Sequence, residues 1–569
     1  MTMTYPFQRF RRQVAEQLAE MARERYGYTG HVRLEEPAEA EMGDVAFPCF
    51  PLAGQAKKAP AAVAEELAAG VSGEWIGHVE AVNGYVNCFI DEQRLAAELP
   101  PQVLEMGERY GAGSDKGESV IVEHTSANPN GPLHVGRGRN PMLGDTLARI
   151  FRYAGYDVET QFYLDDMGKQ VAILAWGLEH LDLAPDAEKP DHRSVIFYQE
   201  ANRRMEEDTQ VSEAIEELIR RCEQGDMETL EHMEQAYRPV LDGVMQTLGR
   251  INISIDSYVR ESRFVLDGTV SDVVARLSET AYADREDDAL YLDLSSFDIH
   301  GRNQKFYLTR RDGTSLYATR DVAYHLWKGR QADRLVNVLG EDHRLEARQV
   351  EIALSLLDAP APTSVFYSFV SMPEGKMSTR RGRVVYLDDL LDEAVERAYR
   401  EVQKRRDLPE EQARAIAEKV GTGAVRYNIL KVSPEKAITF QWEEALNFEG
   451  QSAPFLQYAY ARCCSILDKA GTSQDMKKSS PVFGHEQEIA LLKTIARLPD
   501  VVEQCRERYS PAGLAEYAHE LASRFNGFYR DCRVVGDENE AARLTLVEAT
   551  RVTLHNVLGL LGISPLPEM

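Results

Sequence analysis

The sequence contains few cysteines, and they do not form a metal-binding pattern. Seven cysteines are spread over 569 residues, none forms a CxxC pair, and the 13 histidines show no zinc-type spacing with them. We therefore predict free buried thiols, a reducing compartment and no structural metal. There is no apolar run of about 18 residues, as a membrane span requires, and the N-terminal stretch lacks an apolar secretory segment. These absences predict a cytoplasmic protein with no membrane partner.

Positive charge is also scarce. The formal net charge is −27, which argues against a nucleic-acid partner because neutralising phosphates requires Lys and Arg. The deficit is uneven, however, since residues 450–569 hold 13 Lys and Arg against 15 Asp and Glu, a net of −2. The nearly neutral charge of residues 450–569 therefore still allows a local basic surface in the C-terminal part.

The chain is too long for one hydrophobic core, and it divides into regions of different texture. Residues 1–115 predict a small α/β domain, with helices at Phe10–Tyr26 and near Ala61–Ala69, a strand at Tyr85–Ile90, and a Gly-rich linker near its end. Residues 116–390 alternate strand and helix patterns, which indicates a parallel sheet. Residues 391–569 show long amphipathic helices and no strand signals, so we predict an α-helical bundle there.

Within residues 116–390 the pattern is typical of a βαβ unit. A strand at Ser119–Val122 precedes an amphipathic helix that ends at Gly155, and a second strand follows at Val158–Leu164. Later strands are expected at Arg334–Leu339 and Val365–Val370. Residues 177–255 or so are highly charged and mostly helical in pattern, so they read as an insertion.

The first chemical motif is EHTSANPNGPLHVGRGR, Glu123 to Arg139, at the turn of this βαβ unit. A helix that begins after a parallel strand offers free N–H groups and a favourable dipole to phosphate. Gly136 and Gly138 lack a Cβ, which allows a nucleotide to approach the backbone, and His134 can donate to phosphate in a transition state. Pro141 is tolerated only in a first helical turn, so the helix either starts late or is kinked. The alternative is an ordinary strand–turn–helix with incidental glycines.

The second motif is KMSTRRG, Lys376 to Gly382, which follows an apolar strand and a turn. Lys and Arg on a loop can neutralise the charge that moves onto pyrophosphate. A solvated basic turn is the alternative for this segment taken alone.

The two motifs, in this order and about 240 residues apart, resemble the ATP-binding signatures of class I aminoacyl-tRNA synthetases. The Met-Ser-Thr-Arg form of the second motif and the flanks SANPNGPLH, GDVAFPCFPLA and GYVNCFI narrow the resemblance to the arginyl-tRNA synthetase family, over essentially the whole chain. One departure stands out, because Arg137 replaces the second histidine of the usual His-Ile-Gly-His. Arg137 either adds positive charge at the phosphates or points away from them.

The resemblance implies an α/β fold: a Rossmann-like parallel-sheet catalytic domain with a helical insertion, a small α/β N-terminal domain that contacts tRNA, and a C-terminal α-helical bundle. It implies ATP as substrate with Mg²⁺, arginine and tRNA(Arg) as partners, activation that requires bound tRNA, and a monomer. The catalytic residues it implies are His134, Gly136, Arg137, Lys376, Met377, Ser378 and Arg380, and those that bind ATP are His134, Gly136, Gly138, Lys376 and Ser378.

A selective arginine pocket needs carboxylates, because the guanidinium is a planar fork of five donors. Tyr317 and Asp321 are four residues apart and would share one helix face. Asp165, Asp166 and Gln170 either line the site or stabilise it. The residues that the resemblance assigns to arginine are Glu123, Asn128, Glu261, Tyr317, Asp321 and His343, the last at a place where the family often has glutamine.

The C-terminal segments PFLQYAYARCCSIL and EATRVTLHNVLGLLGI resemble the anticodon-binding domain shared by several class I synthetases. Tyr458, Arg462 and Arg530 are the candidate tRNA contacts, since unstacked bases bind to aromatic and basic side chains; helix packing is the alternative for each. Two other readings of the whole chain stay open. One is a class I synthetase for another amino acid, and the other is an inactive paralogue that binds RNA.

Overall fold

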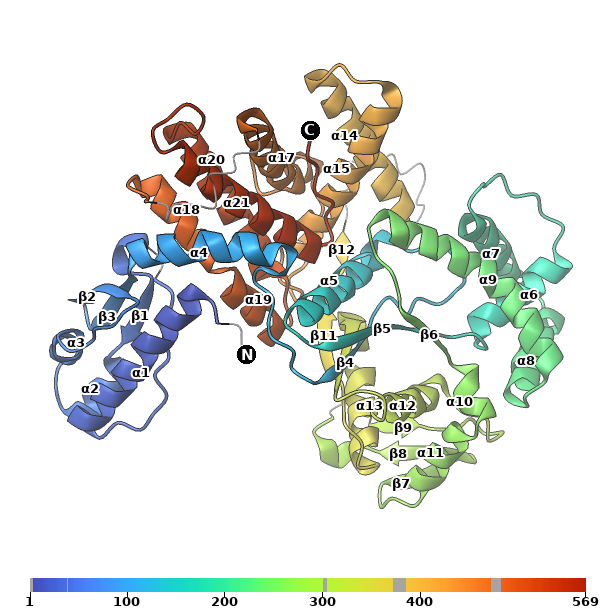
Figure 1. Ribbon diagram of the computed structural model, residues 1–569. Helices are drawn as coiled ribbons and strands as arrows, with labels where there is room; N and C mark the ends of the chain where they lie inside the picture. Colours follow the sequence, from blue (N-terminus) through green and yellow to red (C-terminus); the bar gives the residue numbers. More distant parts are fainter. Residues whose placement is uncertain (1–3, 38, 300–303, 372–384, 472–481) are drawn as a thin grey trace.

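The computed structural model describes residues 4–37, 39–299, 304–371, 385–471 and 482–569. A five-stranded sheet lies near the middle of the molecule, with the N-terminal region on one side and a helical insertion on the other (Figure 1). The C-terminal helices pack together above the sheet in the same view. In the described part of the chain, no helix combines the length and the apolar character needed to cross a membrane.

The N-terminal region is a three-stranded antiparallel sheet covered by helices. Its order is β1-β3-β2, and β3 coincides with the predicted strand. The predicted first helix lies within α1, whose apolar stripe includes the buried Phe10, Val14 and Leu18. The elements are α1 (Pro6–Tyr26), η1 (Ala40–Met42), β1 (Val45–Pro48), α2 (Phe50–Ala56), α3 (Pro60–Ala68), β2 (Ile76–Val82), β3 (Tyr85–Ile90), α4 (Glu92–Met106) and η2 (Gly107–Arg109).

The central sheet is parallel, as predicted, with the order β11-β10-β4-β5-β6. The chain runs outward from β4 through β5 to β6 and then returns to β10 on the other side of β4. The carboxyl ends of β4 and β10 therefore flank the point where strand order reverses, which is where α/β folds bind ligands. The elements are β4 (Ser119–Glu123), η3 (Val135–Arg137), α5 (Arg139–Tyr153), β5 (Asp157–Leu164), β6 (Ser257–Arg260), α12 (Tyr317–Lys328), β10 (Arg334–Gly340), η5 (Glu341–His343), α13 (Arg344–Leu356) and β11 (Thr363–Tyr367).

Two details of this region differ from the sequence-based expectation. The helix after the first motif begins at Arg139, so Pro141 is its third residue and lies in the first turn, where no amide is needed. The strand expected at Val365–Val370 is divided, because the chain leaves the sheet at Ser368, whose amide donates to the carbonyl of Pro434 (3.0 Å).

Two excursions leave the central sheet. The predicted insertion is helical and has its own core around the buried Trp176 and Phe197. A second excursion contains a three-stranded antiparallel sheet, β7-β8-β9, which the sequence analysis did not predict. The elements are α6 (Lys169–His180), α7 (Pro190–Glu207), α8 (Thr209–Glu223) and α9 (Met227–Arg250), then α10 (Ser262–Leu266), α11 (Thr269–Ser278), β7 (Ala283–Glu286), β8 (Ala289–Asp293), η4 (Ser295–Phe297) and β9 (Lys305–Tyr307).

The described part of the C-terminal region is helical, as predicted, apart from a strand of two residues. This strand, Ile438–Thr439, pairs in parallel with Val370–Ser371, so residues 391–569 do contain a strand that the sequence did not indicate. The elements are β12 (Val370–Ser371), α14 (Leu387–Arg405), α15 (Glu410–Leu430), β13 (Ile438–Thr439), α16 (Trp442–Ala445), α17 (Ala453–Ala470), α18 (Glu486–Ala496), α19 (Leu498–Glu507), α20 (Ala512–Asp531) and α21 (Glu540–Leu560).

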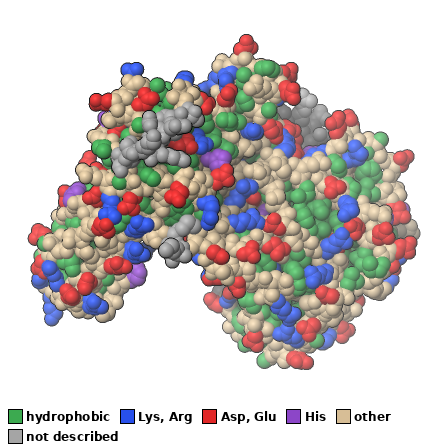
Figure 2. Space-filling view, in the orientation of Figure 1, with side chains coloured by type: hydrophobic (Ala, Val, Ile, Leu, Met, Phe, Trp, Pro, Cys, Tyr) green, Lys and Arg blue, Asp and Glu red, His purple; other side chains and the backbone are tan. Residues whose placement is uncertain are grey.

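One hydrophobic core joins the three regions, since it includes Phe10, Val122 and Leu558. Buried polar contacts reinforce this junction. Arg426 of α15 pairs with Asp145 of α5, and the hydroxyl of Tyr110 donates to the carbonyl of Ile495 of α18 (2.8 Å). The surface in Figure 2 shows acidic and basic side chains interspersed, without a broad area of one sign on that face.

Candidate active site

A cavity of about 540 Å³ opens at the carboxyl ends of β4 and β10. This is the crevice in which the fold predicts a ligand. The cavity is lined by all six residues predicted to bind arginine, namely Glu123, Asn128, Glu261, Tyr317, Asp321 and His343. Arg137 of the first motif lines it too.

The turn after β4 has a strained backbone held by a side chain. Thr125 and Ser126 have positive φ angles of 69° and 33°, which are unfavourable for residues with a Cβ. The Asn140 side chain accepts from the Thr125 amide (2.6 Å) and donates to the carbonyl of Val338 in β10 (2.8 Å). Asn140 therefore links the turn after β4 to β10 at the crevice, a role that was not predicted from the sequence.

The first motif forms the 3-10 turn η3 directly before α5. His134 precedes this turn and is exposed, and its pKa is lowered by partial burial and by the charge of Arg137. Arg137 has its Nη2 3.7 Å from Asp342 Oδ2, with both side chains about half exposed. His134, Gly136 and Gly138 lie outside the lining of the cavity as the described residues define it.

The two glycines of this motif have different surroundings. A Cβ on Gly136 would meet only the Val370 carbonyl at 3.7 Å, an ordinary contact, so the space beside it is open. A Cβ on Gly138 would lie 3.1 Å from Leu387 Cδ1. Gly138 therefore admits the packing of Leu387, and the approach of a nucleotide to its backbone stays a prediction.

Arg139, the first residue of α5, is completely buried and bonded to four carbonyl oxygens. Its guanidinium donates to Ser368 (3.0 Å), Lys436 (2.6 Å), Val432 (2.9 Å) and Ser433 (2.7 Å). Burial lowers the pKa of Arg139 to about 10, which leaves it charged at neutral pH. A permanent cation thus lies at the N-terminal end of α5.

One wall of the cavity is formed by α12 and α13. Tyr317 and Asp321 share a face of α12, as predicted, and Asp321 Oδ1 lies 3.1 Å from His325 Nδ1. Burial tends to raise the pKa of Asp321, but His325, Lys328 and His343 together lower it more, so the pKa lies below its ordinary value. The Tyr317 hydroxyl donates to Glu346 (2.9 Å), and the same carboxylate bonds His343 (2.7 Å), whose pKa it raises.

The floor of the cavity contains a buried ion network. Arg320, only 3% exposed, bonds Glu261 (2.5 Å) and also Glu223 at the end of α8 (2.6 Å). The Tyr163 hydroxyl donates to the other oxygen of Glu261 (3.2 Å). Burial raises the pKa of Glu261 to about 8, with repulsion from Asp165 adding to the effect and Arg320 opposing it. Arg320 and Glu223 were not predicted from the sequence to belong to the site.

Three further carboxylates, those of Glu123, Asp165 and Asp166, differ in their hydrogen-bond and ion-pair partners. Glu123 accepts from the fully buried Lys328 (2.6 Å), which also donates to Asn337 (2.8 Å), so its charge is neutralised within the protein. Asp165 lines the cavity with a buried Oδ1 that has no hydrogen-bond partner, and burial raises its pKa. Asp166 instead accepts from Ser262 and supports the start of α10 (2.8 Å and 2.6 Å).

The second motif lies outside the described residues. The roles of Lys376, Met377, Ser378 and Arg380 therefore remain predictions from the sequence. The chain is described again from Val385, immediately before α14.

The predicted tRNA contacts lie on α17 and α20. The Arg462 guanidinium is sandwiched between the rings of Tyr458 and Tyr529, 4.6 Å from each centroid, and donates to Asn526 (2.7 Å). Both tyrosines are about half exposed, so the group presents aromatic surface with a fixed cation. Arg530 is exposed and pairs with its neighbour Asp531 (2.7 Å).

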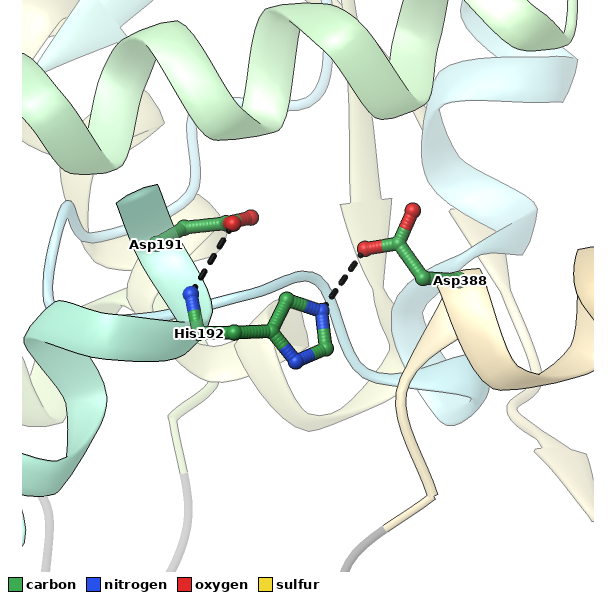
Figure 3. A group of neighbouring side chains, drawn as sticks. All are labelled: Asp191, His192 and Asp388. Carbon is green, nitrogen blue, oxygen red and sulfur yellow. Dashed lines mark hydrogen bonds and ion pairs between the residues drawn. The ribbon is translucent and has the colours of Figure 1, made fainter. Parts of the chain in front are cut away.

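One group in the described part of the chain has the spacing of a metal site, namely Asp191, His192 and Asp388 (Figure 3). Its centre already has a protein cation, because Lys189 Nζ bonds Asp191 (3.0 Å) and Asp388 (2.7 Å). Burial would raise the pKa of Asp388, but bonds from His192 and Lys189 lower it to about 2. The group is a buried ion pair network whose charges are balanced without a metal.

Three family models match successive parts of the chain. They are an arginyl tRNA synthetase N-terminal domain at residues 8–90, the catalytic domain of class I (R) tRNA synthetases at residues 100–442, and a DALR anticodon-binding domain at residues 456–569. The catalytic model alone covers more than half of the chain.

Individual proteins match over nearly the full length. The arginine–tRNA ligase of Methanocella arvoryzae is 48% identical over 544 residues, which cover 93% of this chain and 95% of that protein. The arginine–tRNA ligase of Methanothermobacter thermautotrophicus is 44% identical, with 94% of each chain covered. The solved structure of Thermus thermophilus arginyl-tRNA synthetase superposes with a TM-score of 0.81 at 30% identity, over 98% of this chain and 100% of that one.

Proposed function

This chain belongs to the arginyl-tRNA synthetases, the class I enzymes that ligate arginine to tRNA, and we propose how its own residues carry out that reaction. Arginine and ATP would meet in the cavity between β4 and β10. The arginine carboxylate attacks the α-phosphorus, pyrophosphate leaves, and the arginyl-adenylate then transfers its acyl group to the 3′-terminal adenosine of tRNA, initially at its 2′-hydroxyl, with release of AMP.

For arginine recognition, we propose that Asp321 holds the guanidinium and that Tyr317 borders it. The carboxylate has a lowered pKa and is partly exposed to the cavity, so a charged acceptor is available at neutral pH. Glu261 and Asp165 add acidic oxygen atoms on the floor, and Asn128 and His343 complete the rim. Glu123 would act indirectly, because Lys328 already neutralises it.

For ATP, we propose that the triphosphate binds at the start of α5. The helix dipole and the charge of the buried Arg139 would both contribute positive potential for the triphosphate there. His134 and Arg137 would contact the phosphates, with Gly136 providing the open approach, and Lys376, Met377, Ser378 and Arg380 would act from the second motif. Mg²⁺ would accompany ATP and neutralise the pyrophosphate.

For tRNA, we propose that the Tyr458–Arg462–Tyr529 stack contacts unpaired bases and that Arg530 contacts phosphate. Exposed rings held by a cation present a rigid stacking surface. We further propose that activation requires bound tRNA, that the enzyme acts as a monomer in the cytoplasm, and that the chain divides into domains at about residues 1–115, 116–390 and 391–569.

The observation that carries this proposal is the convergence of the six predicted arginine residues, from four separate stretches of the chain, on one acidic cavity at the switch point of the sheet. The test is arginine-dependent ATP–pyrophosphate exchange by the full chain, with and without tRNA. Exchange that appears only with tRNA supports the full proposal. Exchange without tRNA removes the tRNA requirement, and tRNA binding with no exchange for any amino acid would favour an inactive RNA-binding paralogue.

A further inference from the structure

Tyr386, the residue directly before α14, lies between two histidines from distant parts of the chain. Its ring meets His134 of the first motif edge-on, with centroids 5.5 Å apart and planes at 77°. On another side it meets His192 of α7, with centroids 5.2 Å apart and planes at 72°. Tyr386 therefore connects the first motif to the helical insertion.

The backbone around Tyr386 is tied to the first motif on both sides. The Val135 amide donates to the Val385 carbonyl (3.0 Å), and the Leu387 amide donates to the Leu133 carbonyl (2.7 Å). His134 and Tyr386 form an antiparallel bridge between these bonds. This short pairing fixes the direction in which both side chains leave the backbone.

Asp388, two residues after Tyr386, anchors the same segment to the insertion. It accepts from His192 Nε2 (3.0 Å) and Lys189 Nζ (2.7 Å) at the start of α7, and from Thr247 of α9 (3.0 Å). Figure 3 shows His192 bridging towards Asp388 while its backbone amide donates to Asp191 (2.9 Å). The Asp191 side chain of α7 packs against Gly243 of α9. A Cβ on Gly243 would lie only 2.4 Å from the carboxyl carbon of Asp191, so the two helices pack closely at this point.

Within the described residues, the His134 ring has the Tyr386 ring as its packing partner and no hydrogen bond. A histidine that must meet a phosphate needs a defined ring orientation, because catalytic contacts lose effect when misplaced by an ångström. We propose that Tyr386 is a positioning residue for His134, and that the helical insertion braces Tyr386 through His192 and Asp388. This inference rests on the role proposed above for His134 in arginine activation.

The central experiment is a double-mutant cycle on the full chain, with ATP–pyrophosphate exchange measured in the presence of tRNA. The variants are Tyr386→Leu, Tyr386→Phe, His134→Ala and the Tyr386→Leu/His134→Ala double variant. Loss of the ring contact should lower kcat roughly threefold to tenfold, with the KM for arginine unchanged. Tyr386→Phe keeps the ring and should stay within about twofold of the parent. In the His134→Ala background, Tyr386→Leu should have no further effect.

The brace is tested separately at His192. His192→Phe keeps a ring against Tyr386 but loses the bond to Asp388, whereas His192→Leu loses both. The expected order of kcat is parent, then His192→Phe, then His192→Leu, and the His192→Leu effect should also vanish in the His134→Ala background. His180→Leu is the matched control, because His180 lies on the same insertion, packs on Trp176 and touches nothing near Tyr386. It should leave exchange unchanged.

The outcomes separate this inference from the proposed function. If His134→Ala exchanges like the parent, the assigned role of His134 fails and the inference fails with it. If His134→Ala is impaired but Tyr386→Leu reduces exchange additively, or raises the KM for arginine as much as it lowers kcat, only the positioning role is overturned. If thermal melting shows that Tyr386→Leu does not fold, the His192→Leu cycle decides the question, and additivity there overturns the inference.

Discussion

Asp321→Asn is the change that most directly tests the arginine pocket. The variant removes one negative charge from the cavity wall but keeps an oxygen beside His325, so α12 should keep its packing. A hydrogen bond to a charged partner contributes about 1.5–3 kcal/mol. The Asp321 side chain is 37% exposed, which weakens the charge interaction but leaves it available to a substrate in the cavity.

From these values we expect a loss of about 2–3 kcal/mol in binding the guanidinium. At 1.4 kcal/mol per tenfold, this corresponds to a fall of roughly 30- to 150-fold in kcat/KM for arginine. The KM for ATP should change less than twofold, because the start of α5 is a separate part of the site. The assay is ATP–pyrophosphate exchange with tRNA, in which arginine and ATP are titrated in turn.

The matched control is Asp272→Asn on the neighbouring helix α11, which makes the same change in net charge at an exposed position outside the cavity lining. It should behave like the parent. The reasoning is refuted if Asp321→Asn, with an unchanged melting temperature, lowers kcat/KM for arginine less than threefold, or if ATP and arginine are affected equally.

Three further perturbations test other parts of the site. Arg137→Ala should raise the free-energy barrier to arginine activation by about 2 kcal/mol or more, as for loss of a transition-state donor. A change of less than twofold in the exchange rate would show that Arg137 only forms its ion pair with Asp342. Burial raises the pKa of Glu261 to about 8 from an ordinary 4.5, so the folded state retains its proton and stability should decline as pH rises through this interval. Glu261→Gln should flatten that decline in melting temperature, and parallel curves for parent and variant would contradict it. Arg462→Met should raise the Kd for tRNA, because the two tyrosine rings lose the cation that holds them as a stacking surface; an unchanged filter-binding curve would leave the Tyr458–Tyr529 stack without an RNA role.

Much of the central fold could be predicted from the sequence. The unit from Ser119 to Leu164 combines β-branched strands, an amphipathic helix and a terminal glycine, and each local signal agrees with the others. The antiparallel sheet β7-β8-β9 escaped prediction because its strands have only 3–5 residues and β7, with the sequence ADRE, has no apolar alternation. Short polar strands acquire their structure from their partners, which a local pattern does not reveal.

The site divides in a similar way. Residues such as Tyr317 and Asp321 could be proposed because their helical spacing and chemistry suit a guanidinium. Arg320 could not, since the charge next to Asp321 resembles an exposed helical pair, whereas the fold buries it between Glu261 and Glu223. Glu223 comes from the insertion and meets the pocket only through tertiary packing. Arg320 and Glu223 both lie near a helix end. Charged residues are common at such positions, so this signal alone did not identify them as site residues.

The buried Arg139 has a consequence for how this enzyme works in a saline environment. Ions in solution weaken attraction between exposed charges over about a Debye length, near 8 Å at physiological ionic strength. Arg139 is sealed by four carbonyls and has no exposed surface, so counterions cannot approach it closely. In a protein whose net charge is −27, the attraction that we propose between the start of α5 and a triphosphate should therefore persist at salt concentrations that abolish attraction by surface lysines.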